Sequence, residues 1–294
     1  MIFVSTTYPK KEKTRLEDVL YELKNLEIDG IEIGSTHCYQ HKKEFKNLIK
    51  KNIKNKKIFI HNFFPPTIDT EFVINLASKD KIIHKQSIDM IISNIDFCKS
   101  IDAKLYTIHP GFLSKPSPVI NFKKNNYDFN FSSNVSSYNE AFNKMIFSLK
   151  KIVNYAKFKK MQVAIETEGS IKKKNFLLMQ RPGEFKKLFD EINDNLMVNL
   201  NLSHMHLASK SYNFSIKNFL NYLKPKIAAI EISSNNGIDD QHLPLKENCI
   251  NLEYLKYLNI KKPIILEFRN SNLSQIKKSI SILKKINYGN KIKI

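Results

Sequence analysis

Short apolar segments alternate with amphipathic segments along the whole of this 294-residue chain. Eight segments have the length and apolar character of buried strands: 1–7, 30–35, 58–63, 104–109, 162–167, 196–202, 227–233 and 263–268. Eight more repeat apolar residues at the helical period of about 3.6: 14–26, 43–55, 80–101, 138–160, 183–191, 214–224, 251–258 and 272–286. Strict alternation of strands and helices predicts a parallel sheet, and eight such units predict a closed (β/α)8 barrel, the TIM-barrel fold.

The length of the chain agrees with one barrel. Barrels of about 250 residues are routinely one domain. No Gly/Ser-rich or Pro-rich linker interrupts the pattern, so we expect residues 1–294 to form a single TIM-barrel domain. The one irregular stretch, 112–138, follows the fourth strand and is rich in aromatic residues, Asn and Ser. We expect it to be a long loop with a short substructure of its own, placed over the barrel mouth.

The formal net charge of +20 would ordinarily indicate a nucleic acid or an anionic membrane. Of the 48 basic residues, however, only Arg15, Arg181 and Arg269 are arginines. Abundant Lys together with abundant Asn and Ile is the composition that an AT-rich genome produces in any protein. The lysines are scattered over predicted helix faces, where they usually solvate a surface. Nucleic acid is therefore not the expected partner, although a polyanion-binding face stays open as the alternative.

The three cysteines, Cys38, Cys98 and Cys249, are widely spaced and form no C-x-x-C pair. This spacing predicts neither a disulfide framework nor a structural zinc site, and it fits a reducing compartment. The first residues do not have the order of charge and apolarity found in a signal peptide, and no apolar run is long enough to span a membrane. We expect a soluble cytoplasmic protein without a membrane partner. Whether it forms a homo-oligomer is open.

Five of the apolar runs end in a potential metal ligand or acid/base group: His61, His109, Glu166, Glu231 and Glu267. The carboxyl ends of parallel barrel strands meet at one mouth, so these five side chains should line a single polar site. Strand alternation places Ala164 and Glu166 on the same inward face.

Further polar residues follow the later strands. The sixth strand carries Asn199 and Asn201 at alternate positions, and buried amides are costly unless they have partners. His204 completes an N-x-x-H pattern with Asn201, and Asp240 and His242 form D-Q-H after the seventh strand. These residues extend the predicted site.

The motifs together resemble the xylose isomerase-like barrel superfamily. They are HNFFPP, FVINLAS, IHPG, IETEG, N-x-x-H, D-x-H-L-P-L and LEFR, in this order over about residues 30–270. The superfamily contains sugar isomerases and epimerases, inosose dehydratases and abasic-site nucleases of the endonuclease IV type. The resemblance implies a divalent-metal-dependent sugar isomerase or epimerase that acts on a sugar or sugar derivative by proton transfer next to a carbonyl.

The resemblance also implies roles for the mouth residues. Its metal set falls on Glu166, Asn201, Glu231 and Glu267, where the family more usually has Asp and His in place of Asn201 and Glu231. The formal charge stays at −3 while every ligand becomes an oxygen, which favours Mn²⁺ or Mg²⁺ over zinc. A weakened or absent metal site is the alternative. Glu166 and Glu267 would carry the proton. The substrate would be held by His61, His109, His204, Asp240, His242 and Arg269.

Two other functions are open. Nucleases of the endonuclease IV type resemble the chain at seven of nine ligand positions, which would serve three zinc ions: His61, His109, Glu166, His204, Asp240, His242 and Glu267. The two mismatches, Asn201 and Glu231, fall on the central ion, and an early histidine and Gly-rich DNA-contacting loops are missing. We therefore place the nuclease second. A barrel that binds a saccharide without turnover is the third function.

Overall fold

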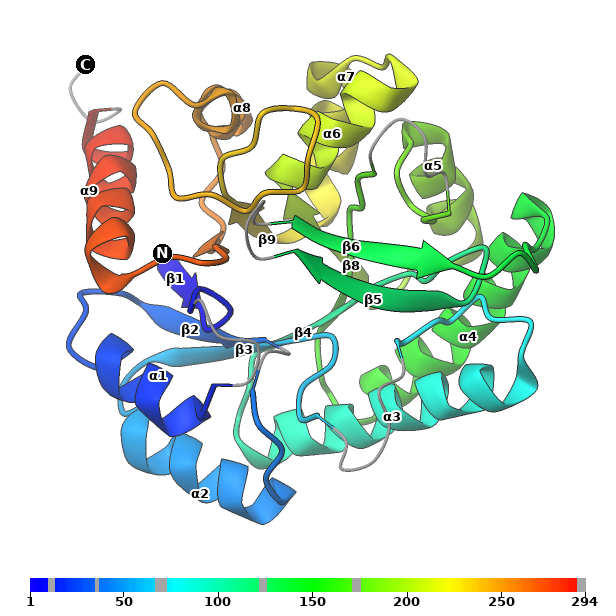
Figure 1. Ribbon diagram of the computed structural model, residues 1–294, viewed down its shortest axis with the longest axis horizontal. Coiled ribbons are helices and arrows are strands. Elements are labelled where there is room, and N and C mark those ends of the chain that lie inside the picture. The colour runs from blue at the N-terminus through cyan, green and yellow to red at the C-terminus, as the bar shows by residue number, and fades with distance from the viewer. Residues whose placement is uncertain (10–13, 35–36, 67–72, 122–125, 171–175, 290–294) are drawn as a thin grey trace.

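The computed structural model describes residues 1–294 except 10–13, 35–36, 67–72, 122–125, 171–175 and 290–294. Eight parallel strands close into a barrel in the order β1, β2, β3, β4, β7, β8, β9, β10 and back to β1 (Figure 1). They are β1 (Ile2–Ser5), β2 (Gly30–Ile33), β3 (Lys57–His61), β4 (Leu105–Ile108), β7 (Val163–Glu166), β8 (Leu196–Asn201), β9 (Ile227–Ile232) and β10 (Ile264–Leu266). Seven of these strands lie inside the predicted ranges, and β3 begins one residue before its range. The predicted (β/α)8 TIM barrel is confirmed.

Helices surround the barrel (Figure 1). They are α1 (Leu16–Leu23), α2 (Lys42–Asn52), α3 (Lys81–Ser100), α4 (Tyr138–Phe158), α5 (Pro182–Glu191), α6 (Leu202–Tyr212), α7 (Ile216–Leu223), α8 (Ile250–Leu258) and α9 (Leu273–Gly289). Eight of these were predicted. No amphipathic pattern predicted α6, because residues 202–209 are all buried and this helix therefore has no apolar stripe opposite a polar face.

The predicted substructure after β4 is a β-hairpin. Its strands β5 (Pro116–Asn121) and β6 (Asn126–Phe131) pair antiparallel, and the hairpin crosses in front of the barrel in Figure 1. The loop between β7 and α5 fixes its base: the backbone N–H of Leu113 donates to the carbonyl of Phe176 at 2.7 Å, and the Phe131 ring stacks on Phe176. The hairpin thus begins at the mouth end of the barrel, where the sequence placed it.

The barrel interior is divided into an apolar floor and a polar layer. The floor consists of Phe3, Phe59, Leu105, Ala164, Ala229 and Ile265. Phe3 and Phe59 stack with ring centroids 4.3 Å apart. A Cβ atom on Gly30 would lie 2.1 Å from the Phe3 ring, so only glycine fits beside it. Since side chains alternate along a strand, the inward residues two positions further along form the polar layer above this floor.

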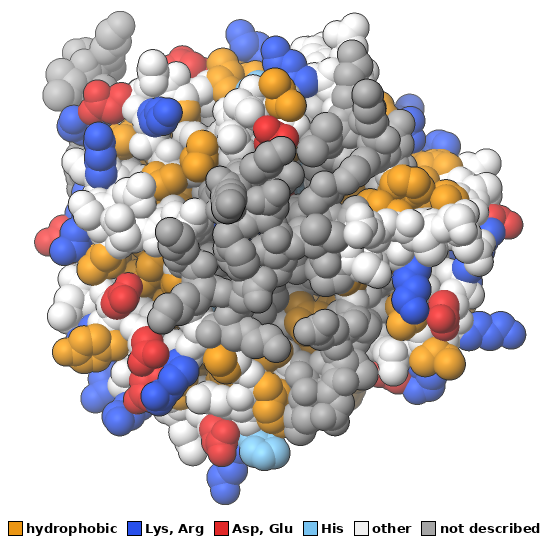
Figure 2. Space-filling model, in the orientation of Figure 1, with side chains coloured by type: hydrophobic (Ala, Val, Ile, Leu, Met, Phe, Trp, Pro, Cys, Tyr) orange, Lys and Arg blue, Asp and Glu red, His pale blue; other side chains and the backbone are white. Residues whose placement is uncertain are grey.

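Basic side chains on the face shown in Figure 2 lie at scattered points, with acidic side chains among them. Several lysines are paired with carboxylates; Lys150 lies 2.7 Å from Glu191, and Lys284 lies 2.6 Å from Glu27. This distribution agrees with lysines that solvate a surface. Within the described residues, no helix is both long enough and apolar enough to cross a membrane.

Candidate functional site at the barrel mouth

The polar layer brings all the predicted mouth residues together at the C-terminal ends of the strands. His61, Glu166 and Asn201 are the last residues of β3, β7 and β8. Glu231 lies within β9, and Glu267 directly follows β10. All five are buried, and Glu231 is fully inaccessible to solvent. Buried carboxylates at this density require partners, and the surrounding imidazoles provide them.

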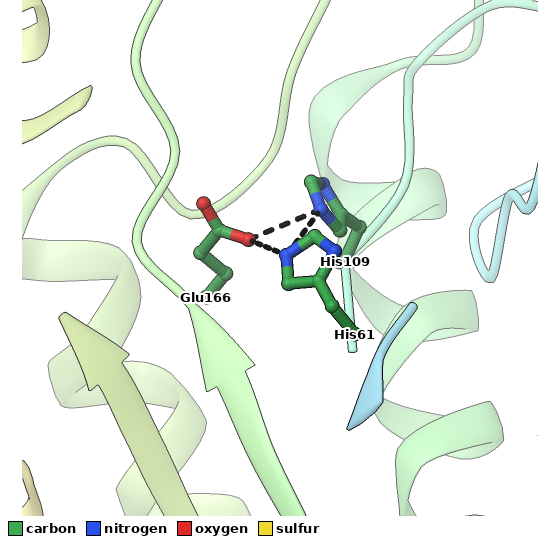
Figure 3. A group of neighbouring side chains, drawn as sticks. All are labelled: His61, His109 and Glu166. Atoms are coloured by element: carbon green, nitrogen blue, oxygen red, sulfur yellow. Dashed lines mark hydrogen bonds and ion pairs between the residues drawn. The ribbon is translucent and has the colours of Figure 1, made fainter. Parts of the chain in front are cut away.

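The first group of side chains comprises His61, His109 and Glu166. Figure 3 shows both imidazole rings beside one carboxylate oxygen of Glu166. His61 Nε2 donates to Glu166 Oε2 at 2.9 Å, and His109 Nε2 lies 3.0 Å from the same oxygen. The two Nε2 atoms are 3.3 Å apart. On the other side of its ring, His109 Nδ1 lies 2.7 Å from Glu168 Oε1, which fixes the orientation of the imidazole.

The second group comprises His204, Asp240 and His242. Asp240 Oδ1 lies 3.3 Å from His204 Nε2 and 2.8 Å from His242 Nε2. His204 lies in the first turn of α6, which directly follows β8, and its Nδ1 lies 3.0 Å from Glu166 Oε1. His242 Nδ1 lies 3.1 Å from Glu267 Oε2. These contacts join the second group to the central carboxylates.

Arg269 borders the second group. Its guanidinium donates to Asp240 Oδ2 at 3.3 Å. The side chain is 28% exposed, so the guanidinium lies at the edge of the mouth rather than inside it. A charged group of an incoming molecule could reach it there.

Three carboxylates surround the side-chain amide of Asn201 at the centre of the mouth. Its Nδ2 lies 3.0 Å from Glu166 Oε1, 3.0 Å from Glu231 Oε2 and 3.1 Å from Glu267 Oε2. Glu231 also accepts from Asn199 Nδ2 at 2.6 Å. The two buried asparagines thus have the partners that the sequence analysis required.

The imidazoles of the first two groups have raised pKa values. Burial lowers the pKa of His109, but Glu166 and Glu168 outweigh burial and hold the pKa well above its usual value. Burial likewise opposes charge on His204, and Asp240 and Glu166 raise its pKa well above the usual value. The pKa of their partner carboxylate, Glu166, is shifted in the opposite direction. Burial raises the pKa of Glu166, yet the neighbouring imidazoles, led by His109, lower it well below its usual value.

The pKa values of two central carboxylates, Glu231 and Glu267, are shifted in opposite directions. Burial, together with Glu166 and Glu267, raises the pKa of Glu231 well above its usual value. For Glu267, burial again raises the pKa, but the imidazole of His242 overcomes this effect and lowers the pKa to about 2. Two acids in one site with pKa values moved apart can serve as proton donor and proton acceptor.

Glu32 is a buried acid that the sequence analysis did not select. It lies in β2, is fully buried, and neither of its carboxylate oxygens has a hydrogen-bond partner among the described residues. Burial raises its pKa to about 7. The sequence feature that could have indicated this residue is an acid inside the apolar run Gly30–Ile33, at an inward position rather than at the end of the run.

The side chains fit metal ions in the two outer groups. Each outer group presents two imidazoles and one carboxylate whose ligand atoms lie within 4.8 Å of one another. In the second group, Asp240 Oδ1 and both ring nitrogens of His242 have no hydrogen bond of acceptable geometry within the described part of the chain, although Oδ1 lies only 2.8 Å from His242 Nε2. Polar atoms that lie close together without a hydrogen bond between them can converge on a shared ion. His61, Glu231 and Glu267 form a third set of ligand atoms at the centre.

A parallel eight-stranded barrel with imidazoles and carboxylates at its C-terminal mouth belongs to the class of TIM barrels that place an active site there. The family model of the xylose isomerase-like TIM barrel matches residues 20–286. The chain belongs to this family, and the predicted membership of this enzyme superfamily is confirmed.

Relatives of several kinds share this fold or sequence. An uncharacterized protein of Methanocaldococcus jannaschii is 28% identical over 220 residues, which are 72% of this chain and 73% of that protein. A probable endonuclease 4 of Metamycoplasma arthritidis is 26% identical over 272 residues, 85% of each chain. Among solved structures, a D-tagatose 3-epimerase-like protein superposes with a TM-score of 0.74 at 20% identity, with 99% of both chains covered. At these identities the structural likeness establishes the fold.

Proposed function

We propose that the protein is a divalent-metal-dependent sugar isomerase or epimerase, which moves a proton at a carbon next to a carbonyl. The observation that carries this proposal is the convergence of Glu166, Glu231 and Glu267 within 3.1 Å of one amide nitrogen, at the mouth of a barrel. Support also comes from fold neighbours that include a D-psicose 3-epimerase of Clostridium cellulolyticum with D-tagatose, with a TM-score of 0.66 at 12% identity and 98% of both chains covered.

The outer groups would hold the ions. His61, His109 and Glu166 form one set of ligands, and His204, Asp240 and His242 form the other. A divalent ion supplies a Lewis acid that polarises carbonyl and hydroxyl oxygens of the sugar. Imidazole-containing sets suit Zn²⁺ as well as Mn²⁺, so the Mn²⁺ or Mg²⁺ preference predicted for the central set does not extend to them. In this proposal five residues that the sequence analysis assigned to the substrate are ion ligands instead.

The central carboxylates would move the proton. Glu267, ionised because of its low pKa, would accept a proton from the carbon next to the carbonyl. The electron pair of the broken C–H bond would form a C=C bond, and the π pair of the C=O bond would move onto the carbonyl oxygen, giving an enediolate. A proton returned to the opposite face gives the epimer, and one returned to the neighbouring carbon gives the isomer. The raised pKa of Glu231 favours its protonated form, so this acid would return the proton. Glu166, the second carrier predicted from the sequence, has a lowered pKa and would act here as an ion ligand. Arg269, partly exposed at the edge of the mouth, would bind a phosphate or carboxylate of the substrate.

Deuterium exchange tests this function without knowledge of the product. The protein is loaded with Mn²⁺ or Zn²⁺ and incubated in D₂O with ketohexoses and ketopentoses and their phosphates. We expect deuterium at the carbon next to the carbonyl of at least one sugar, together with an epimer or isomer visible by NMR, because solvent protons equilibrate with a carboxylate that carries the transferred proton. Absence of exchange for every sugar with either ion would remove the isomerase or epimerase function.

A second candidate function is abasic-site DNA cleavage. Its specific support is the pair of two-histidine, one-carboxylate groups on either side of the central carboxylates, at the positions where the chain resembles endonuclease IV. The probable endonuclease 4 relatives point the same way. The scattered lysines and the few arginines argue against the nuclease function, because phosphate contacts in nucleases depend on clustered cations and backbone amides.

We expect only weak binding to duplex DNA near physiological salt, with no preference for an abasic site and no strand cleavage when Zn²⁺ or Mn²⁺ is added. A labelled duplex with one abasic analogue, compared with the intact duplex, measures both binding and cleavage. Incision of the abasic strand that disappears in Glu166→Gln would make the nuclease the correct function.

A further inference from the structure

The side-chain amide of Asn201 lies where a central ion would have to bind. Its Nδ2 is surrounded by oxygens of Glu166, Glu231 and Glu267 at 3.0–3.1 Å. Two of these acids, with His61, form the third set of ligand atoms at the mouth. An ion among these oxygens would have to occupy the space of the amide group.

The orientation of this amide is fixed by the helix that follows it. Asn201 is the N-cap of α6, and its Oδ1 accepts from the backbone N–H groups of Ser203 and His204, both at 3.1 Å. A flipped amide would turn its own N–H groups toward these two donors and leave both without an acceptor. Nδ2 must therefore face the carboxylates, and it offers them N–H donors where a cation requires a lone pair.

The backbone of Asn201 is equally constrained. Its N–H donates to Thr167 Oγ1 at 2.9 Å, and the hydroxyl of Thr167 lies 3.3 Å from the Asn201 carbonyl oxygen. The Asn201 residue is 1% exposed. The side chain thus cannot move aside without breaking contacts on both of its ends.

We propose that the Asn201 carboxamide takes the place of a central metal ion, so that the mouth holds ions only in the two outer groups. The amide N–H groups bind the central carboxylates directly and keep them gathered in the absence of an ion. This proposal replaces the prediction that Asn201 is a metal ligand. It depends on the proposed function only in treating the mouth as an ion-binding site.

Aspartate at position 201 should restore the central site. An Asp side chain has the same shape, so one oxygen can keep the cap of α6 while the other faces Glu166, Glu231 and Glu267 as an anionic ligand. Asn201→Asp is therefore expected to bind one more ion than the natural protein. The matched control is Asn199→Asp, which adds the same charge one inward position deeper, where the side-chain amide donates to Glu231 and Thr107.

The experiment is zinc analysis and anomalous diffraction of the natural protein and both variants, after each is stripped with a chelator, soaked in ZnCl₂ and checked for folding by circular dichroism. We expect about two zinc ions per chain in the natural protein and in Asn199→Asp, and about three in Asn201→Asp, with the new peak among the central carboxylates. A peak at the centre of the natural protein would overturn the inference, as would a folded Asn201→Asp without one. If Asn201→Asp does not fold, the presence or absence of a central zinc peak in the natural protein decides the inference. Because ion position is read without turnover, the inference and the proposed reaction can fail independently.

Discussion

Glu166→Gln is expected to lose the ion of the first outer group and at least about 1,000-fold in turnover. Glu166 contacts more of the mouth than its neighbours do: one oxygen lies within 3.0 Å of His61 and His109, and the other lies 3.0 Å from both His204 and Asn201. The substitution removes the anionic ligand and turns an amide NH₂ toward one of these groups. Zinc content and the initial rate of deuterium exchange measure the two losses.

Glu168→Gln is the matched control for this variant. Glu168 follows Glu166 by two residues and contacts His109 through Nδ1, the nitrogen that faces away from the ion group. Loss of an orienting carboxylate typically costs about 10–100-fold in metal affinity or activity, so this variant should retain the ion at saturating zinc. Metal content and turnover equal to those of the natural protein in Glu166→Gln would show that the first group is not an ion site.

The barrel and the composition of its mouth could be predicted because they depend on local patterns. Apolar runs such as VAIE and IAAIE are short, bounded and followed by amphipathic helices, which is the signature of buried parallel strands. Strand alternation then places Ala164 in the apolar floor and Glu166 in the polar layer above it. A period of two residues, applied to a closed barrel, is sufficient to predict which side chains meet.

The orientation of single groups at the mouth could not be predicted in the same way. The sequence suggests Asn201 as a ligand because it occupies a ligand position of the resembled family. Its amide faces the carboxylates because α6 begins at the next residue, and that helix has no recognisable apolar stripe. Glu32 was overlooked for a different reason: only residues that end an apolar run were selected, whereas Glu32 lies inside the predicted strand 30–35 and is fully buried. Such features depend on which donors and acceptors tertiary packing brings together.

Zinc binding is expected to depend steeply on pH, with affinity rising as pH rises. The imidazoles of both outer groups have pKa values raised by neighbouring carboxylates, which outweigh burial. The raised pKa values favour the protonated rings when no metal is bound, yet an ion requires neutral imidazole. Each group must therefore release up to two protons, and affinity should rise up to about 100-fold per pH unit below the raised pKa values. Titration calorimetry in buffers of different ionisation enthalpy counts the protons released.

The stability of the metal-free protein should change with pH in the opposite direction. A histidine whose pKa is raised by folding stabilises the fold fully below its unfolded pKa of about 6.5, and this stabilisation disappears as pH rises through the folded pKa. As pH rises above about 6.5, the melting temperature of the chelated protein should therefore fall, while that of the zinc-loaded protein should rise. His206→Gln is the control, because burial lowers the pKa of His206 and its side chain lies outside the ion groups. Parallel pH profiles for the two forms, or zinc binding without proton release, would mean that these imidazoles are neutral before the ion arrives and that the mouth carboxylates do not hold them charged.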